Sequence, residues 1–139
     1  MVNKMIIRLG YVAISKAIDI TSSGTITYTN YLKEENKDEK LDKIIKSNLE
    51  NLEKILSYNV KNNIHFYRLT SKLIPLATHK DVSFEYINKY KGYYEKISKI
   101  IDKNNMRVDV HPDQFCVLNS TNKETINNSI EILKYHINI

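Results

Sequence analysis

Three short apolar runs alternate with three long amphipathic segments along this chain. The apolar runs cover residues 5–9, 64–69 and 106–110, a length typical of buried strands. In the other segments apolar residues recur every three or four positions, as they do in helices. These apolar positions are Leu41, Ile44, Ile45, Leu49, Leu52, Ile55 and Leu56, then Phe84, Ile87, Tyr90, Tyr94, Ile97 and Ile101, and finally Ile126, Ile130, Leu133 and Ile137. The pattern predicts the order β-α-β-α-β-α.

Polar residues and glycine mark the expected ends of these elements. Gly10 is expected to end the first strand, and a polar loop rich in Ser and Thr is expected over residues 15–36. Asparagine pairs are expected to stop the first two helices. The expected helix starts are an Asn36–Glu39 capping box, a Ser83 cap and a Thr121–Glu124 capping box, and the expected stops are Asn62-Asn63 and Asn104-Asn105.

Strands that alternate with long helices favour an α/β fold with a parallel sheet. A doubly wound sheet and a (β/α)₈ barrel both fit, but no glycine-rich nucleotide loop or Walker sequence is present, which favours the barrel. A complete barrel needs about 250 residues and eight βα units. The 139 residues supply three. We therefore expect a single domain, residues 1–139, that forms a partial TIM (β/α)₈ barrel of about three βα units, with open strand edges that need a partner.

Composition adds little to this picture. A net charge of +5 is compatible with a polyanionic partner, but an evenly basic surface explains it equally well. The single cysteine, Cys116, cannot form an internal disulfide, and it follows Phe115 in an apolar run, which predicts a small buried side chain in a reducing compartment. Arg8 interrupts the apolar N-terminal stretch, so no signal peptide is expected, and no segment is long and apolar enough for a membrane span. A cytoplasmic protein is expected.

The candidate chemistry follows the second and third predicted strands. His111 comes directly after the third strand, where inward polar residues build sites for metals or phosphates in α/β barrels. His79 lies in the loop after the second strand, where a functional and a structural role are equally plausible. His65 begins the second strand and His136 lies within the last helix, and both are expected to be structural, His136 at the surface or between helices.

Gln114 and Phe115 follow His111 and offer an amide beside an aromatic ring. Enzymes that extract bases from a duplex use such groups to replace base pairing and stacking, although the spacing alone favours a turn amide followed by a core phenylalanine. Tyr11 is expected near the same mouth. Arg68 is a candidate partner for a phosphate or for Asp109.

Three segments together resemble the UV-damage endonuclease family. They are IRLGY at residues 7–11, the stretch NLEKILSYNVKNNIHFYRLTSKLIPLATH that ends at His79, and RVDVHPDQFCVLNS at residues 107–120. The resemblance covers essentially the whole chain, in order. It implies a TIM barrel similar to that of endonuclease IV, and metal-dependent incision of double-stranded DNA immediately 5′ of UV photoproducts. Manganese is the metal that the resemblance implies.

The resemblance also implies roles for individual residues. His111 matches a metal-binding histidine, and His79 matches a site histidine that contacts metal or phosphate, so both are expected to be catalytic. Gln114 and Phe115 match two residues that wedge into DNA opposite the lesion. The matches in the lesion pocket are Tyr11 and, at a position that is Asn in some members, Ser15.

The family's remaining metal ligands lie on later strands, and this chain does not contain them. We therefore consider three hypotheses: the N-terminal portion of a UV-damage endonuclease whose missing C-terminal half is supplied from elsewhere, a catalytically silent remnant or weak DNA-binding fragment, and a metal-dependent barrel of the sugar isomerase or epimerase type. The isomerase predicts sugar-binding carboxylates in place of the Gln-aromatic pair.

Overall fold

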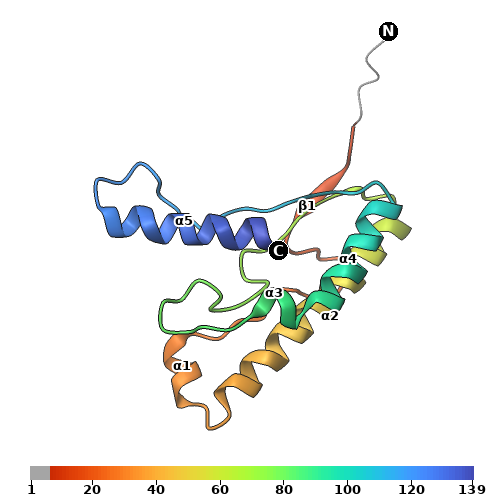
Figure 1. The fold of residues 1–139 in the computed structure, drawn as a ribbon. Helices are drawn as coiled ribbons and strands as arrows, with labels where there is room; N and C mark the ends of the chain where they lie inside the picture. The colour runs from red at the N-terminus through yellow and green to blue at the C-terminus, as the bar shows by residue number, and fades with distance from the viewer. Residues whose placement is uncertain (1–6) are drawn as a thin grey trace.

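The computed structural model describes residues 7–139, which form a three-stranded parallel sheet with helices on one face (Figure 1). The strands β1, β2 and β3 stand in chain order in the sheet. The element order confirms the predicted βα succession and adds two short helices. In chain order the elements are β1 (Gly10–Val12), α1 (Tyr28–Lys33), α2 (Lys37–Lys61), β2 (Phe66–Arg68), α3 (Tyr86–Lys89), α4 (Lys91–Lys103), β3 (Arg107–Asp109) and α5 (Lys123–Asn138).

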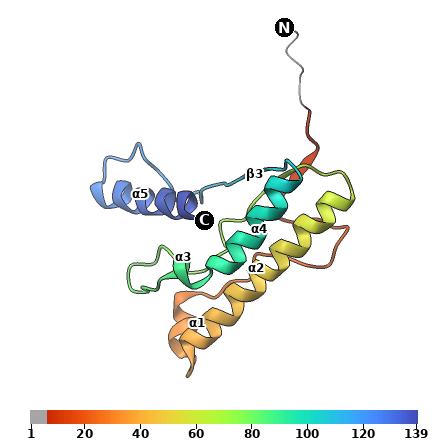
Figure 2. The ribbon, with the colours of Figure 1, turned by 45° about the vertical axis from the view of Figure 1, so that its right-hand side comes forward.

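The core lies between the sheet and the helix pair α2 and α4, which run side by side in both ribbon views (Figures 1 and 2). Tyr67 is the central strand residue on this face and is fully buried, with Tyr11 and Val108 beside it in the register. The predicted apolar face of α2 supplies the largest share of the core. Its buried apolar side chains are Leu41, Ile45, Leu49, Leu52, Ile55 and Leu56.

The opposite face of the sheet is polar. Arg107 pairs with Asp109 across 3.1 Å, and its guanidinium lies over the Phe66 ring at 5.8 Å. Val12, in register with Arg68 on the same face, is 53% exposed. The sheet therefore has one helix-covered apolar face and one charged face. A parallel sheet with this division agrees with the predicted α/β class, whereas a barrel of three units remains a prediction.

The first predicted strand was misplaced. Residues 5 and 6 lie outside the described part of the chain, residues 7–9 are not in a strand, and β1 begins at Gly10, the residue expected to end it. A Cβ on Gly10 would lie 2.3 Å from the backbone oxygen of Phe66, so the two strands approach closely because this residue has no side chain.

Two helix starts also differ from expectation. Asn36 occupies the N-cap of α2 but its side chain makes no cap hydrogen bond. The cap of α5 is Asn122 rather than Thr121, because the Asn122 side chain accepts hydrogen bonds from the backbone N–H groups of Glu124 and Thr125. Both asparagine stops are confirmed, with Asn63 and Asn105 at positive φ.

Two short helices were not predicted as separate elements. The polar loop expected over residues 15–36 contains α1, whose start is capped by the Thr27 side chain. The helix expected to start at Ser83 is divided into α3 and α4 at Tyr90, whose φ of −109° and ψ of 16° interrupt the helix. Tyr90 is buried and its hydroxyl donates to Asp42 on α2 at 2.8 Å, so a tertiary contact accompanies the break.

Candidate functional site

The loops after β2 and β3 meet the C-terminal half of α5. Their shared walls enclose a cavity of about 250 Å³, lined by Pro75 of one loop, Asp113 and Phe115 of the other, and Tyr135 and His136 of α5. The Ile74 N–H donates to the Tyr135 hydroxyl at 3.1 Å, which joins the first loop to α5. Because both loops follow the carboxyl ends of parallel strands, this is the part of the fold where α/β proteins bind ligands.

Asp113 shapes the turn that carries Gln114 and Phe115. Its carboxylate accepts a hydrogen bond from the Phe115 N–H at 3.1 Å, and its backbone oxygen accepts one from the Cys116 N–H at 2.9 Å. The turn leaves Gln114 exposed and Phe115 70% exposed. Phe115 is therefore a surface ring on a hydrogen-bonded turn, not a core phenylalanine.

The segment after this turn is held by Ser129 of α5. The buried Ser129 hydroxyl accepts a hydrogen bond from the Val117 N–H at 2.7 Å and donates to the Thr125 carbonyl at 2.8 Å. Cys116, expected to be buried, is half-buried with its thiol 3.7 Å from the Ser129 carbonyl. These contacts fix the path of the chain between β3 and α5.

His111 is exposed, two residues beyond the end of β3. It lowers the pKa of His136, which is buried, so of the two positions expected for His136 the surface one is wrong. Burial lowers the pKa of the His136 imidazole and His111 lowers it further, while Asp113 opposes both. Neither ring nitrogen of His136 has a hydrogen-bond partner among the described residues.

His79 lies outside that cavity, in the loop between β2 and α3. Its imidazole stacks on the Tyr28 ring, with centroids 4.0 Å apart and planes inclined by 22°, and its Nδ1 accepts the Asp81 N–H at 3.3 Å. Tyr28 begins α1, the helix that the sequence did not predict. The structure thus places the two predicted catalytic histidines in different loops.

Tyr11 and Ser15 form a separate group. The Tyr11 ring lies on the helix-covered face of the sheet, edge-on to Tyr67 at 5.2 Å, and its hydroxyl donates to Asn59 at 2.8 Å. Burial raises the pKa of the Tyr11 hydroxyl. The Ser15 hydroxyl accepts the Ala17 N–H at 3.2 Å. In this arrangement the Tyr11 hydroxyl is engaged with α2 instead of being presented to a ligand.

The remaining sequence candidates are His65 and Arg68. The carbonyl of His65 accepts a ladder bond from the Arg107 N–H at 2.8 Å, and its ring is half-buried, in keeping with the expected structural role. Arg68 is half-buried, and no ion pair joins it to Asp109, which pairs instead with Arg107. In residues 7–139 no three His, Cys, Asp or Glu side chains gather closely enough to hold a metal ion.

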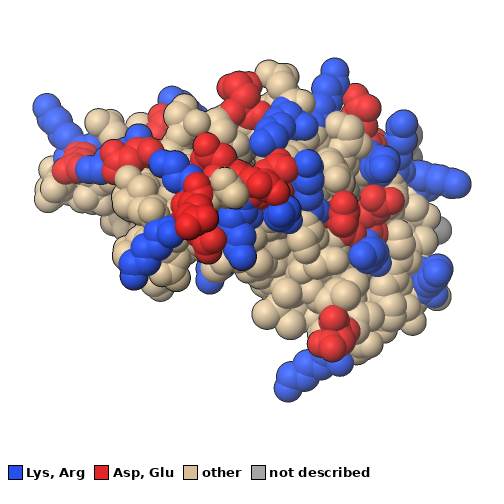
Figure 3. All heavy atoms as spheres, turned by 90° about the horizontal axis from the view of Figure 1, so that it is seen from below, with Lys and Arg blue, Asp and Glu red and all other residues tan. Residues whose placement is uncertain are grey.

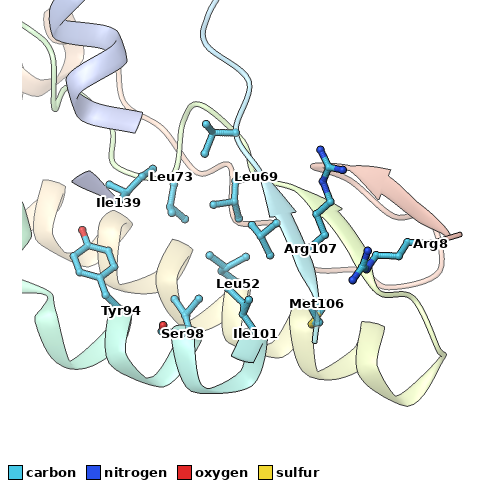
Figure 4. A pocket seen from close by; sticks show the side chains of 13 residues that line it. Arg8, Leu52, Leu69, Leu73, Tyr94, Ser98, Ile101, Met106, Arg107 and Ile139 are labelled. Atoms are coloured by element: carbon cyan, nitrogen blue, oxygen red, sulfur yellow. The ribbon is translucent and has the colours of Figure 1, made fainter. Parts of the chain in front are cut away.

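A larger cavity lies elsewhere, between α4 and β3 (Figure 4). Its volume is about 580 Å³, and its walls are mainly apolar, with Leu52, Leu69, Tyr94 and Ile101 pointing into it and Arg8 at the rim. None of the predicted site residues lines it.

The charge pattern on the face in Figure 3 is mixed. Lysine or arginine and acidic side chains interleave there. Ion pairs along α2 follow the same mixed pattern, such as Lys43 with Glu39 at 2.7 Å and Lys46 with Asp42 at 2.8 Å. That face therefore offers no concentrated positive field to a polyanion. No helix among residues 7–139 is both long and apolar enough to span a bilayer.

Comparison with known proteins decides the family. The model of the UV-endonuclease UvdE family matches residues 7–139. The chain belongs to this family. It is 38% identical over 138 residues to the "UV DNA damage endonuclease" of Bacillus mycoides (strain KBAB4), and equally to that of Bacillus cereus (strain 03BB102). Each match covers 97% of this chain and 44% of the relative.

A solved UvdE-type structure has the same fold. The crystal structure of SacUVDE superposes with a TM-score of 0.87 at 33% sequence identity, over 96% of this chain and 44% of that one. The chain thus spans less than half the length of the UvdE proteins it matches. The family assignment agrees with the resemblance noted from the sequence and decides against the sugar isomerase alternative.

Two features of the site escaped the sequence analysis. The Tyr28 stack on His79 joins residues 51 positions apart in sequence, so no local pattern could signal it. The buried His136 did carry a signal, because Ile132 and Leu133 precede it by four and three residues and therefore lie on the same side of the helix.

Proposed function

We propose that this chain provides the lesion-contacting part of an endonuclease that cuts double-stranded DNA immediately 5′ of UV photoproducts. The observation that carries the proposal is the exposed pair Gln114 and Phe115 on the turn braced by Asp113, in a chain of the UvdE family. A 70% exposed phenylalanine gains by stacking on a base, and the neighbouring amide can donate to and accept from a base edge.

We further propose that His111 contributes one ligand to a divalent metal centre, with manganese as the expected ion. Manganese prefers carboxylate and other oxygen ligands, and imidazole also binds divalent first-row metals. Because no three suitable side chains gather in residues 7–139, this part of the chain does not fit a metal cluster by itself. Hydrolysis is therefore assigned to a protein in which further ligands complete the centre.

A second candidate is a catalytically silent DNA-binding fragment. It is favoured by the same lack of a three-ligand group in residues 7–139. Under this reading the chain binds DNA weakly through Phe115 and never cuts it.

An incision assay separates the two. Residues 1–139 are joined to the part of the Bacillus mycoides relative that lies beyond the match, and the fusion is incubated with Mn²⁺ and an end-labelled duplex that carries one photoproduct. We expect a cut immediately 5′ of the lesion by the fusion and none by residues 1–139 alone. A folded fusion that leaves the duplex intact would contradict the proposal and support the fragment reading.

Phe115 offers a matched control in the same assay. Phe115→Tyr keeps the ring and is expected to retain incision, whereas Phe115→Leu removes stacking worth about 1–3 kcal/mol and is expected to weaken binding to the damaged duplex roughly 5- to 150-fold. Equal binding by the two variants would exclude the wedge role.

A further inference from the structure

The imidazole of His79 stacks on an aromatic ring of α1. The Tyr28 ring lies 4.0 Å from it, and Tyr28 in turn contacts the Tyr31 ring at 6.3 Å with planes inclined by 26°. The Tyr31 hydroxyl donates to Asp38 in the first turn of α2 at 2.5 Å. Because Tyr31 is buried and tied to α2, the ring that stacks on His79 belongs to a helix that is itself held in place.

A backbone group selects the tautomer of this ring. The Asp81 N–H donates to His79 Nδ1 at 3.3 Å, and an amide N–H can only donate. Nδ1 is therefore the unprotonated nitrogen, and in the neutral ring the proton is on Nε2. The loop itself is fixed on both sides of the ring, since the His79 N–H donates to the Leu76 carbonyl and the His79 carbonyl accepts the Val82 N–H, each at 3.0 Å.

This arrangement is the reverse of the one that metal-binding histidines use. Such a histidine binds the ion through one nitrogen and donates the N–H of the other to a carboxylate or carbonyl. Here the second nitrogen of His79 faces a donor, so the nitrogen left for a ligand carries the proton. An Nε2–H group suits an anionic oxygen and cannot coordinate a cation.

We propose that Tyr28 is a positioning residue which, together with the Asp81 N–H, presents His79 Nε2–H as a hydrogen-bond donor to a phosphate oxygen and not as a metal ligand. The choice of a DNA phosphate as the anion rests on the proposed function. The sequence left the two roles of His79 open, and the ring stack and the Asp81 contact favour one of them.

Nitrogen-15 NMR of the histidine rings in residues 1–139 tests the tautomer. At a pH where His79 is neutral, we expect its Nε2 to be protonated and its Nδ1 to be free. Tyr28→Leu removes the stack that holds the ring against the Asp81 N–H, so the ratio of the two tautomers is expected to shift towards that of a free imidazole. Tyr28→Phe retains the ring and is expected to restore the ratio.

Two additions test the ligand class. Inorganic phosphate and an undamaged DNA duplex are each expected to shift the His79 ring signals, the duplex at lower concentration, and Tyr28→Leu is expected to weaken both shifts. Mn²⁺ alone is expected to broaden His79 no more than His65, which serves as the control histidine.

Several results would overturn the inference: an unprotonated Nε2, selective broadening of His79 by Mn²⁺, no shift with either anion, or a tautomer ratio unchanged in Tyr28→Leu. A chain that is unfolded under these conditions would overturn it as well, because the stack would not exist. A response to inorganic phosphate with none to DNA would reject the DNA phosphate. None of these readouts requires cleavage, so failure of the incision assay is a separate outcome.

Discussion

Replacing Asn48 by alanine is expected to destabilise the fold more than any other single amide substitution on α2. The Asn48 side chain is buried and accepts the Gly24 N–H at 2.8 Å. Its Nδ2 donates to the carbonyls of Gly24, Lys72 and Leu73 at 2.8, 3.3 and 3.0 Å. One amide thereby joins the loop before α1, the helix α2 and the loop that leads from β2 to the candidate site.

The magnitude follows from these contacts. Nδ2 has two hydrogens for its three acceptors, so the side chain makes about three full hydrogen bonds, each worth about 0.5–1.5 kcal/mol net. Alanine also leaves the buried Leu73 carbonyl and the part-buried backbone groups of Gly24 without their partner, and a buried group costs about 1–3 kcal/mol when unpaired. We therefore expect Asn48→Ala to lower the free energy of unfolding by about 2–4 kcal/mol.

Urea unfolding followed by far-UV circular dichroism measures this change, given a two-state transition. Asn51→Ala is the matched control, because it lies three residues further along the same helix and its side chain makes one exposed hydrogen bond, to the Thr21 carbonyl at 2.9 Å. Its expected cost is about 1 kcal/mol or less.

An isosteric change gives a second check. Asn48→Asp keeps the acceptor for the Gly24 N–H but sets carboxylate oxygen against backbone carbonyls, so at pH 7 it is expected to cost at least as much as alanine. A loss below about 1 kcal/mol in Asn48→Ala, or one equal to that of Asn51→Ala, would refute the reasoning.

Three further predictions concern stability and pH. Gly10→Ala is expected to lower the free energy of unfolding in urea by about 1–3 kcal/mol, because its Cβ would meet the Phe66 backbone at 2.3 Å. The control is Gly92→Ala on α4, whose Cβ would have nothing within 4 Å and which is expected to raise that free energy by about 0.5–1 kcal/mol. Equal effects of the two substitutions would contradict this reasoning. Burial raises the pKa of the Asp42 carboxyl, but hydrogen bonds from two lysines and a tyrosine outweigh it and lower that pKa from 3.8 to about 2. Part of the folding stability should therefore be lost as pH falls from about 4 to 2, and Asp42→Asn should remove this dependence in acid titrations of the free energy of unfolding. The pKa of His136 is lowered from 6.5 by burial, so stability should be complete above pH 6.5 and decline as pH falls below it; a His136→Leu variant with an unchanged slope there would exclude the imidazole as the cause.

Much of the fold followed from hydrophobic periodicity. The long helices α2, α4 and α5 and the strands β2 and β3 lie within or close to their predicted ranges, because repeated apolar positions and asparagine stops mark them locally. The errors occur where a tertiary contact decides. Gly10 lies inside a strand because β1 approaches Phe66 closely, and the helix expected after Ser83 breaks where Tyr90 bonds to Asp42.

The sequence predicted which loops carry the candidate site residues, but not how their side chains are arranged in space. The expected ends of the strands correctly predicted that His79 and His111 lie in the loops after β2 and β3. The His-Pro-x-Gln segment marked the position of the turn that exposes Phe115. The stack of Tyr28 on His79 joins an unpredicted helix to a distant loop, and no local pattern specifies such a pair.

The measurement that tests the central claim most directly is the position of DNA incision by residues 1–139 joined to the remaining part of the Bacillus mycoides UV DNA damage endonuclease. With Mn²⁺ and a duplex that carries one photoproduct, the account predicts a single cut immediately 5′ of the lesion and a severe loss of that cut in His111→Ala. A folded fusion that cuts nowhere, cuts undamaged DNA equally, or cuts normally without His111 would contradict it.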